Sequence, residues 1–260
     1  MLDGGLVSIT FRQLDPEAII ALMKRTALTH LEWGGDVHCP HGDVDTATRV
    51  GEATRDAGLT VSVYGSYYRC GVSEGAGLAF AEVLASARAM QAPAIRVWAG
   101  QLNREDADDA YRAKVVEDAK GVADLAAAAG LTIVFEYHGG TLTNTHDGAI
   151  ELIEAIDRPN VRMGWQPVPE RSVEQNLADL DDLLARGVLG SVHAFEWTSE
   201  EGKKVRHPLA EGEAHWPPRL AKLRNAGVDV PVLIEFVQGN DPEQFVADAE
   251  ALARWLDAAR

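Results

Sequence analysis

The stretch Gly130-Leu-Thr-Ile-Val-Phe-Glu136-Tyr-His138 decides the fold class. Its apolar, largely β-branched run predicts a strand buried on both faces, as in a parallel sheet that helices cover on either side. The run ends in an acid, an aromatic residue and a histidine. Because α/β folds keep their chemistry at the carboxyl ends of parallel strands, Glu136 and His138 are candidates for a functional site.

The same order of an apolar strand and then a helix repeats along the chain, giving eight strand–helix units. Such alternation predicts parallel strand pairing through right-handed crossovers. Eight units in 260 residues predict an α/β protein with a closed (β/α)8 TIM barrel, forming a single domain over residues 1–260. The alternative is an open doubly wound sheet, but no glycine-rich dinucleotide turn follows the first strand. The predicted strands span residues 6–11, 30–35, 59–64, 94–100, 131–136, 160–166, 188–197 and 230–237.

The composition limits the partners and the compartment. The net charge is −16, from 40 acidic and 24 basic residues, and no basic patch is evident, so a nucleic-acid partner is not expected. The two cysteines, Cys39 and Cys70, form neither a disulfide framework nor a Cys-x-x-Cys zinc motif, which suits a reducing cytoplasm. The first residues do not resemble a signal peptide, and no apolar run is long enough to span a bilayer. We therefore expect a cytoplasmic protein with no membrane partner.

Carboxylates and imidazoles gather at the ends of the predicted strands, and in a barrel these ends share one mouth. Such groups, taken from separate strands, suit Mn²⁺, Mg²⁺, Co²⁺ or Zn²⁺. A single glutamate at a strand end is usually only a solvated surface group, so the argument rests on several of them together. The candidates are Glu32, His38, His41, Tyr64, Trp98, Glu136, His138, Gln166, His193, Glu196 and Glu235.

The chain resembles the xylose isomerase-like barrel proteins, a superfamily of sugar phosphate isomerases and epimerases that also includes the AP endonuclease IV type. The resemblance covers essentially the whole chain and implies the same (β/α)8 barrel. Its motifs are fairly specific for the superfamily in this order, but they do not specify a substrate. They are Leu31-Glu-Trp-Gly-Gly-Asp-Val-His38, Gly130 to His138 as quoted above, Ser191-Val-His-Ala-Phe195, Pro208-Leu-Ala-Glu-Gly-Glu213 and Val232-Leu-Ile-Glu-Phe-Val237.

The resemblance implies a metal site. In ketohexose 3-epimerases of this superfamily, Glu, Asp, His and Glu from the fifth to eighth strands hold one metal ion, and these positions match Glu136, Gln166, His193 and Glu235. Gln166 departs from the pattern, because an amide stands where the family has a carboxylate. The amide oxygen still suits a hard cation, but the site has one negative charge fewer.

The implied chemistry is proton transfer next to a carbonyl. A divalent metal stabilises the enediolate oxygens, and Glu136 and Glu235 act as catalytic groups that take and return protons from opposite faces. The leading hypothesis is a metal-dependent isomerase or epimerase of a sugar or keto-sugar. Dehydration of a keto-inositol and a non-catalytic sugar- or metal-binding barrel subunit remain alternatives. An endonuclease IV-like phosphodiesterase would need a basic DNA-binding face and more histidine and aspartate ligands than the 8 histidines and this acidic chain offer.

Further side chains near the strand ends are expected to contact the substrate. Each has a plainer explanation, since histidines also make ordinary loop hydrogen bonds and tryptophans at a barrel mouth also serve packing. Barrels of this type often pair, so a homo-oligomer is left open. The predicted substrate-binding residues are His38, His138, Glu32, Trp98, Trp165 and Trp197.

Overall fold

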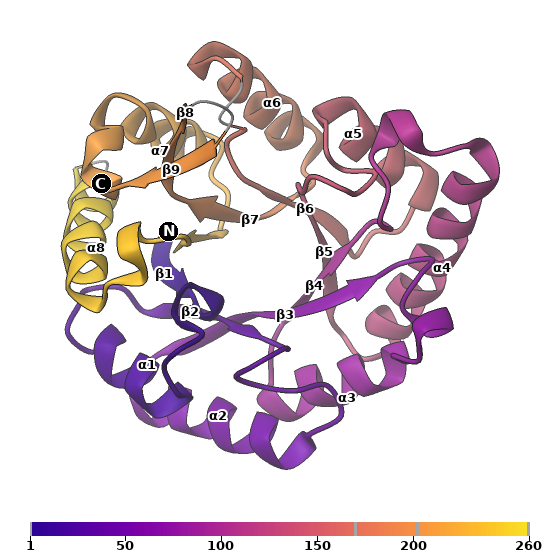
Figure 1. Ribbon diagram of the computed structural model, residues 1–260, viewed down its shortest axis with the longest axis horizontal. Helices are drawn as coiled ribbons and strands as arrows, with labels where there is room; N and C mark the ends of the chain where they lie inside the picture. The colour runs from indigo at the N-terminus through magenta and orange to yellow at the C-terminus, as the bar shows by residue number, and fades with distance from the viewer. Residues whose placement is uncertain (1, 169–170, 201–202, 259–260) are drawn as a thin grey trace. The chain divides into compact units, whose positions relative to one another are not determined.

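The computed structural model describes residues 2–168, 171–200 and 203–258. Its strands confirm the predicted (β/α)8 architecture: eight of them follow one another as β1-β10-β7-β6-β5-β4-β3-β2 in a closed barrel. Helices separate these strands along the chain (Figure 1). The barrel strands are β1 (Asp3–Val7), β2 (His30–Gly34), β3 (Thr60–Arg69), β4 (Ala94–Trp98), β5 (Thr132–Glu136), β6 (Val161–Trp165), β7 (Leu189–Ala194) and β10 (Pro231–Ile234).

Side-chain caps begin several of the helices. Asp15 caps the first helix by accepting a 2.8 Å hydrogen bond from the amide of Ala18. Ser172 forms a reciprocal capping box with Gln175 at the start of the sixth helix. The helices are α1 (Pro16–Met23), α2 (Val44–Asp56), α3 (Phe80–Met90), α4 (Asp109–Ala128), α5 (His146–Ile156), α6 (Val173–Arg186), α7 (Trp216–Asn225) and α8 (Pro242–Asp257).

The described residues form two compact units. The first unit contains the residues up to Glu32, Ala53–Thr60 and those from Trp165 onward, and the second contains Trp33–Glu52 and Val61–Gly164. In the first, β1 pairs in parallel with β2 and β10, and β10 pairs with β7. In the second, β4 pairs in parallel with β3 and β5, and β5 pairs with β6. Each unit therefore places the carboxyl ends of its own strands side by side.

Two sequence predictions were wrong in detail. The first strand runs over Asp3–Val7, and residues Ser8–Phe11, which we predicted as strand, form a 3-10 helix. The seventh strand was predicted over 188–197, but β7 ends at Ala194 and an antiparallel hairpin of β8 (Glu196–Glu200) and β9 (Lys203–His207) follows, of which β9 is drawn in orange in Figure 1. No helix in the described ranges is long and apolar enough to cross a membrane.

Candidate active site

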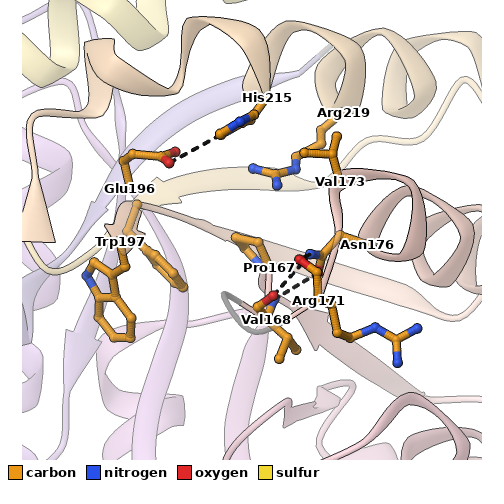
Figure 2. A pocket seen from close by; sticks show the side chains of 10 residues that line it. Pro167, Val168, Arg171, Val173, Asn176, Glu196, Trp197, His215 and Arg219 are labelled. Atoms are coloured by element: carbon orange, nitrogen blue, oxygen red, sulfur yellow. Dashed lines mark hydrogen bonds and ion pairs between the residues drawn. The ribbon is translucent and has the colours of Figure 1, made fainter. Parts of the chain in front are cut away.

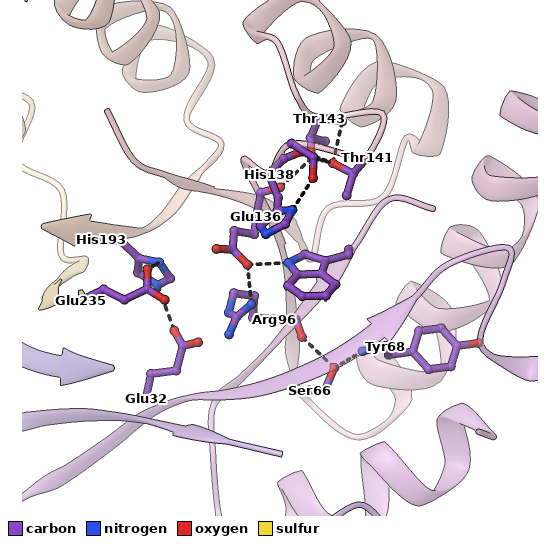
Figure 3. Close-up of polar contacts among 12 residues, drawn as sticks. Glu32, Ser66, Tyr68, Arg96, Glu136, His138, Thr141, Thr143, His193 and Glu235 are labelled. Carbon is purple, nitrogen blue, oxygen red and sulfur yellow. Dashed lines mark hydrogen bonds and ion pairs between the residues drawn. The ribbon is translucent and has the colours of Figure 1, made fainter. Parts of the chain in front are cut away.

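In the first unit, a buried histidine lies between two buried carboxylates. Glu32 belongs to β2, His193 to β7, and Glu235 follows β10 directly. Glu32 is 0% exposed, His193 2% and Glu235 3%. The Nε2 atom of His193 lies 3.1 Å from a carboxylate oxygen of Glu32, and its Nδ1 lies 3.1 Å from Oε2 of Glu235 (Figure 3). Each ring nitrogen of His193 therefore lies next to a carboxylate oxygen.

The electrostatics of this cluster favour a cation. Burial alone would lower the pKa of His193, but the charges of Glu235 and Glu32 outweigh it and raise the pKa to about 10. The two carboxylates thus favour a positive charge at this place, which either a proton on the imidazole or a metal ion can supply. Within the described part of the chain, Oε2 of Glu235 accepts no hydrogen bond of good geometry. A buried carboxylate oxygen without a hydrogen-bond donor has a lone pair that a metal ion can use.

In the second unit, Glu136 is the last residue of β5 and is 4% exposed. Arg96 forms an ion pair with its Oε2 through Nη1, and the indole Nε1 of Trp98 donates to the same oxygen at 2.5 Å (Figure 3). Arg96 and Trp98 are two residues apart on β4, so both side chains leave the same face of that strand. Charge-assisted donors from a neighbouring strand therefore fix the direction in which the Glu136 carboxylate faces.

An aromatic and cationic layer surrounds the indole of Trp98. The guanidinium carbon of Arg69 lies 4.2 Å from the centre of the Trp98 ring. The ring of Tyr67 meets it edge-on at 5.1 Å, and the imidazole of His138 lies 4.6 Å from it at a tilt of 34°. Trp98 and His138, which were predicted separately as substrate contacts, thus form one contiguous surface beside Glu136.

The other predicted substrate residues differ in burial. His38 is 2% exposed and its ring meets that of Trp33 edge-on, 5.8 Å between centres. Trp165 is 1% exposed, whereas Trp197 is partly exposed and stacks on Phe195 at 4.3 Å. Their roles as substrate contacts stay predictions. For Glu32, complete burial against His193 favours a role through that histidine, and its contact with substrate also stays a prediction.

Three buried residues, Glu136, His193 and Glu235, each offer a ligand atom that suits a metal ion. Gln166 directly follows β6 and is partly buried. Arg96 was not among the predicted site residues, although the sequence contains a signal for it. An arginine in the middle of an apolar strand is expected only where an acid accompanies it, because a buried charge needs a partner.

The family of the chain follows from its sequence pattern. Residues 21–258 match the pattern of the xylose isomerase-like TIM barrel family. The chain belongs to this family. The resemblance noted from the motifs is therefore confirmed. No curated protein matches the sequence of this family member.

Solved structures share the fold of this xylose isomerase-like protein at low identity. The probable 3-DHS dehydratase AsbF from Bacillus anthracis is 18% identical, with a TM-score of 0.75 over 98% of both chains. A D-allulose 3-epimerase from Methylomonas sp. in complex with D-allulose is 15% identical, with a TM-score of 0.72 over 100% of this chain and 97% of that one. A xylose isomerase-like barrel from Mycobacterium smegmatis in complex with magnesium is 14% identical, with a TM-score of 0.69 over 94% and 89%. The neighbours thus include epimerases and a dehydratase.

Proposed function

We propose that the chain is a divalent-metal-dependent isomerase or epimerase of a sugar or keto-sugar. The observation that carries the proposal is His193 on β7, which lies 3.1 Å from each of two buried carboxylates, Glu32 on β2 and Glu235 directly after β10. Membership of the xylose isomerase-like family supports it, as do neighbours whose names include D-allulose 3-epimerase and a complex with magnesium.

The proposed metal ligands are Glu136, Gln166, His193 and Glu235. Carboxylate and amide oxygens with one imidazole nitrogen fit Mn²⁺, Mg²⁺, Co²⁺ or Zn²⁺. Glu32 is then a positioning residue: by holding one ring nitrogen of His193, it orients the other toward the ion. When bound, the ion acts as a Lewis acid on the substrate's carbonyl and hydroxyl oxygens.

Glu136 and Glu235 are the proposed proton-transfer groups. One carboxylate removes the proton from the carbon next to the carbonyl, and the proton is returned by the same or the other carboxylate to complete isomerisation or epimerisation. Arg96 and Trp98 hold Oε2 of Glu136, which keeps that carboxylate in one orientation during the transfer. The low exposure of both glutamates leaves their carboxylates little contact with bulk water.

Dehydration next to a carbonyl uses the same groups, so a keto-inositol-type dehydratase is the second candidate. The likeness to the 3-DHS dehydratase, at 18% identity, is one of fold. The products separate the two reactions: an epimerase returns an isomer of its substrate, whereas a dehydratase releases water and leaves an unsaturated product. A non-catalytic barrel would bind a sugar without converting it.

The first test is the metal content of the purified protein, compared with a Glu235→Gln variant. Glu250→Gln is the matched control, because Glu250 is exposed on α8 of the same unit. We expect stoichiometric Mn, Mg, Co or Zn in the wild type and in the control, and its loss in Glu235→Gln. If the wild type holds no metal and none of these ions changes its thermal stability, the proposed mechanism is wrong.

The second test measures chemistry directly. A panel of ketoses and keto-inositols is incubated in deuterium oxide, and deuterium at the carbon next to the carbonyl is followed by NMR. We expect exchange with the wild type and a loss of about 10²-fold or more in Glu136→Gln and in Glu235→Gln, which is the usual contribution of a general base. Metal binding without any exchange would favour the non-catalytic alternative.

A further inference from the structure

A cavity in the first unit lies beyond the ends of β6 and β7, next to the first turns of α6 and α7 (Figure 2). Its volume is about 80 Å³. One water molecule needs about 10–15 Å³ on the same measure, so the space admits a small chemical group. The lining residues that matter to the argument are Arg171, Val173, Glu196, Trp197, His215 and Arg219.

Arg219 is the unusual member of this lining. It is 4% exposed, yet no acid in the described ranges forms an ion pair with it, and its Nε–H has no hydrogen-bond partner there. Its guanidinium only faces the rings of Trp216 at 4.9 Å and Trp165 at 5.9 Å. In Figure 2 the guanidinium extends from α7 into the space between His215 and Pro167. The charge of Glu196 acts on it without forming an ion pair and does not outweigh the effect of burial, so the guanidinium has lost hydration without gaining a directly bound counter-charge.

Burial also lowers the pKa of Arg219, to about 10. The group is nevertheless still charged at neutral pH, so the cavity contains a positive charge under ordinary conditions. Arg171 adds a second: one of its terminal nitrogens contacts Asp179 at 2.8 Å, while its own Nε has no hydrogen-bond partner in the described part of the chain.

Two helices direct their N-termini at the same space. Val173 is the first residue of α6, which has 14 residues, and His215 is the N-cap of α7, which has 10. Both residues line the cavity. The N-terminal end of a helix dipole favours an anion, and this adds to the two guanidinium groups.

The remaining lining residues indicate more than a bare ion. Glu196 pairs with His215 at 3.2 Å, and its carboxylate can also accept hydrogen bonds from hydroxyl groups. Trp197 adds an aromatic wall. Asn176 is occupied, since its side chain accepts a hydrogen bond from the backbone nitrogen of Val168 and donates one to the backbone oxygen of the same residue.

We propose that this cavity binds the oxyanion group, a carboxylate or a phosphate, of a small hydroxylated molecule, with Arg219 as its main contact. Arg171 and the two helix N-termini add positive potential, and Glu196 receives a neighbouring hydroxyl. None of its residues belongs to the proposed metal ligands, although Trp197, a predicted substrate contact, is part of its lining.

The test is anion binding by the whole protein, measured by isothermal titration with inorganic phosphate and separately with acetate, at matched ionic strength. Arg219→Met removes the charge and keeps much of the apolar bulk. Arg224→Met is the control, since Arg224 lies on the same helix but outside the cavity. We expect at least about tenfold weaker binding in Arg219→Met, as for the loss of a hydrogen bond to a charged group, and no change in the control.

The tighter of the two anions identifies the chemical class of the bound group. Equal binding to the wild type and both variants, or no binding of either anion to the wild type, would overturn the proposal. Should Arg219→Met fail to fold, Arg171→Gln replaces it, because that side chain is 36% exposed and its replacement is tolerated more easily. Unchanged phosphate and acetate binding in Arg171→Gln would then count against the site.

Discussion

Arg96 and Arg219 are both almost completely buried, at 1% and 4% exposure, but they differ in what accompanies the charge. Arg96 forms an ion pair with Glu136, and its guanidinium also faces the ring of Tyr67 at 5.4 Å. Arg219 faces two aromatic rings and forms no ion pair within the described part of the chain, where the charge of Glu196 acts on it without direct contact. The protein itself neutralises the charge of Arg96 with a directly bound carboxylate, whereas the guanidinium of Arg219 has no such partner among the described residues.

The difference separates two uses of a buried charge. An ion pair inside the fold fixes a side chain, and Arg96 thereby fixes the carboxylate of Glu136. A buried guanidinium beside a cavity is available to a ligand, and the missing counter-charge is then supplied by binding. Aromatic rings give a cation about 0.5–2 kcal/mol, which is less than the desolvation of a charge costs. Removing Arg96 should therefore destabilise the fold strongly, whereas removing Arg219 should leave its stability nearly unchanged.

The largest effect is expected from Arg96→Met. It leaves Glu136 buried without its cation, which should lower the free energy of unfolding by about 3–5 kcal/mol. Urea unfolding followed by circular dichroism measures the change. The double variant Arg96→Met/Glu136→Gln should recover much of the loss, because the uncompensated charge is gone. A loss below about 1 kcal/mol in the single variant would mean that the Arg96–Glu136 pair contributes no more than a surface ion pair, and Arg96 would then not differ from Arg219.

The barrel and its strand ends could be predicted because local pattern determines them. The apolar run of β5 ends at Glu136 in the structure as in the sequence, and Glu235 directly follows β10. The start of β1 was missed because Gly4 and Gly5 are poor strand formers. A Cβ on Gly5 would lie 2.1 Å from the backbone oxygen of His30, so the close approach of β2 requires glycine there.

The hairpin and the Arg219 cavity had no local signal. The strand β9 reads Lys-Lys-Val-Arg-His, which lacks the apolar alternation that marks a strand. Arg219 lies on an ordinary amphipathic helix, and only the tertiary structure shows that it is buried and forms no ion pair with a described acid. Periodicity predicts which residues are buried, but it does not predict which charge lacks a partner.

Asp248 provides the acidic counterpart of Arg219 and an intermediate effect. It is 2% exposed, and its carboxylate accepts hydrogen bonds only from neutral donors among the described residues, the amide of Leu209 and the side chain of Gln244, each at 2.8 Å. Burial raises its pKa from 3.8 to about 6. The folded state therefore holds this proton more tightly than the unfolded state, and the associated stability is present below pH 4 and is lost as the pH rises through 6.

Asp248→Asn keeps the acceptor oxygen and removes the charge. Relative to the wild type, we expect it to be more stable at pH 7, by up to about 3 kcal/mol for a two-unit shift, and no different near pH 3.5. Urea unfolding at a series of pH values gives the difference between the two proteins. A constant difference across that range would mean that the carboxylate of Asp248 does not titrate as described.

The smallest effect is expected from Arg219→Met, and the small size of the change in stability is the informative part. In buffer without phosphate or carboxylates, loss of the ring contacts should be balanced by relief of the buried charge. We therefore expect a stability within about 1 kcal/mol of the wild type, with Arg224→Met as the reference for a change on the same helix. A loss above about 2 kcal/mol would show that the fold itself needs the guanidinium, and Arg219 would then resemble Arg96.

Saturating anion should stabilise the wild type and not Arg219→Met, because a ligand that binds only the folded state adds its binding free energy to the free energy of unfolding. If the difference in the free energy of unfolding between the wild type and Arg219→Met is the same with and without anion, Arg219 does not bind an anion and the contrast with Arg96 is lost.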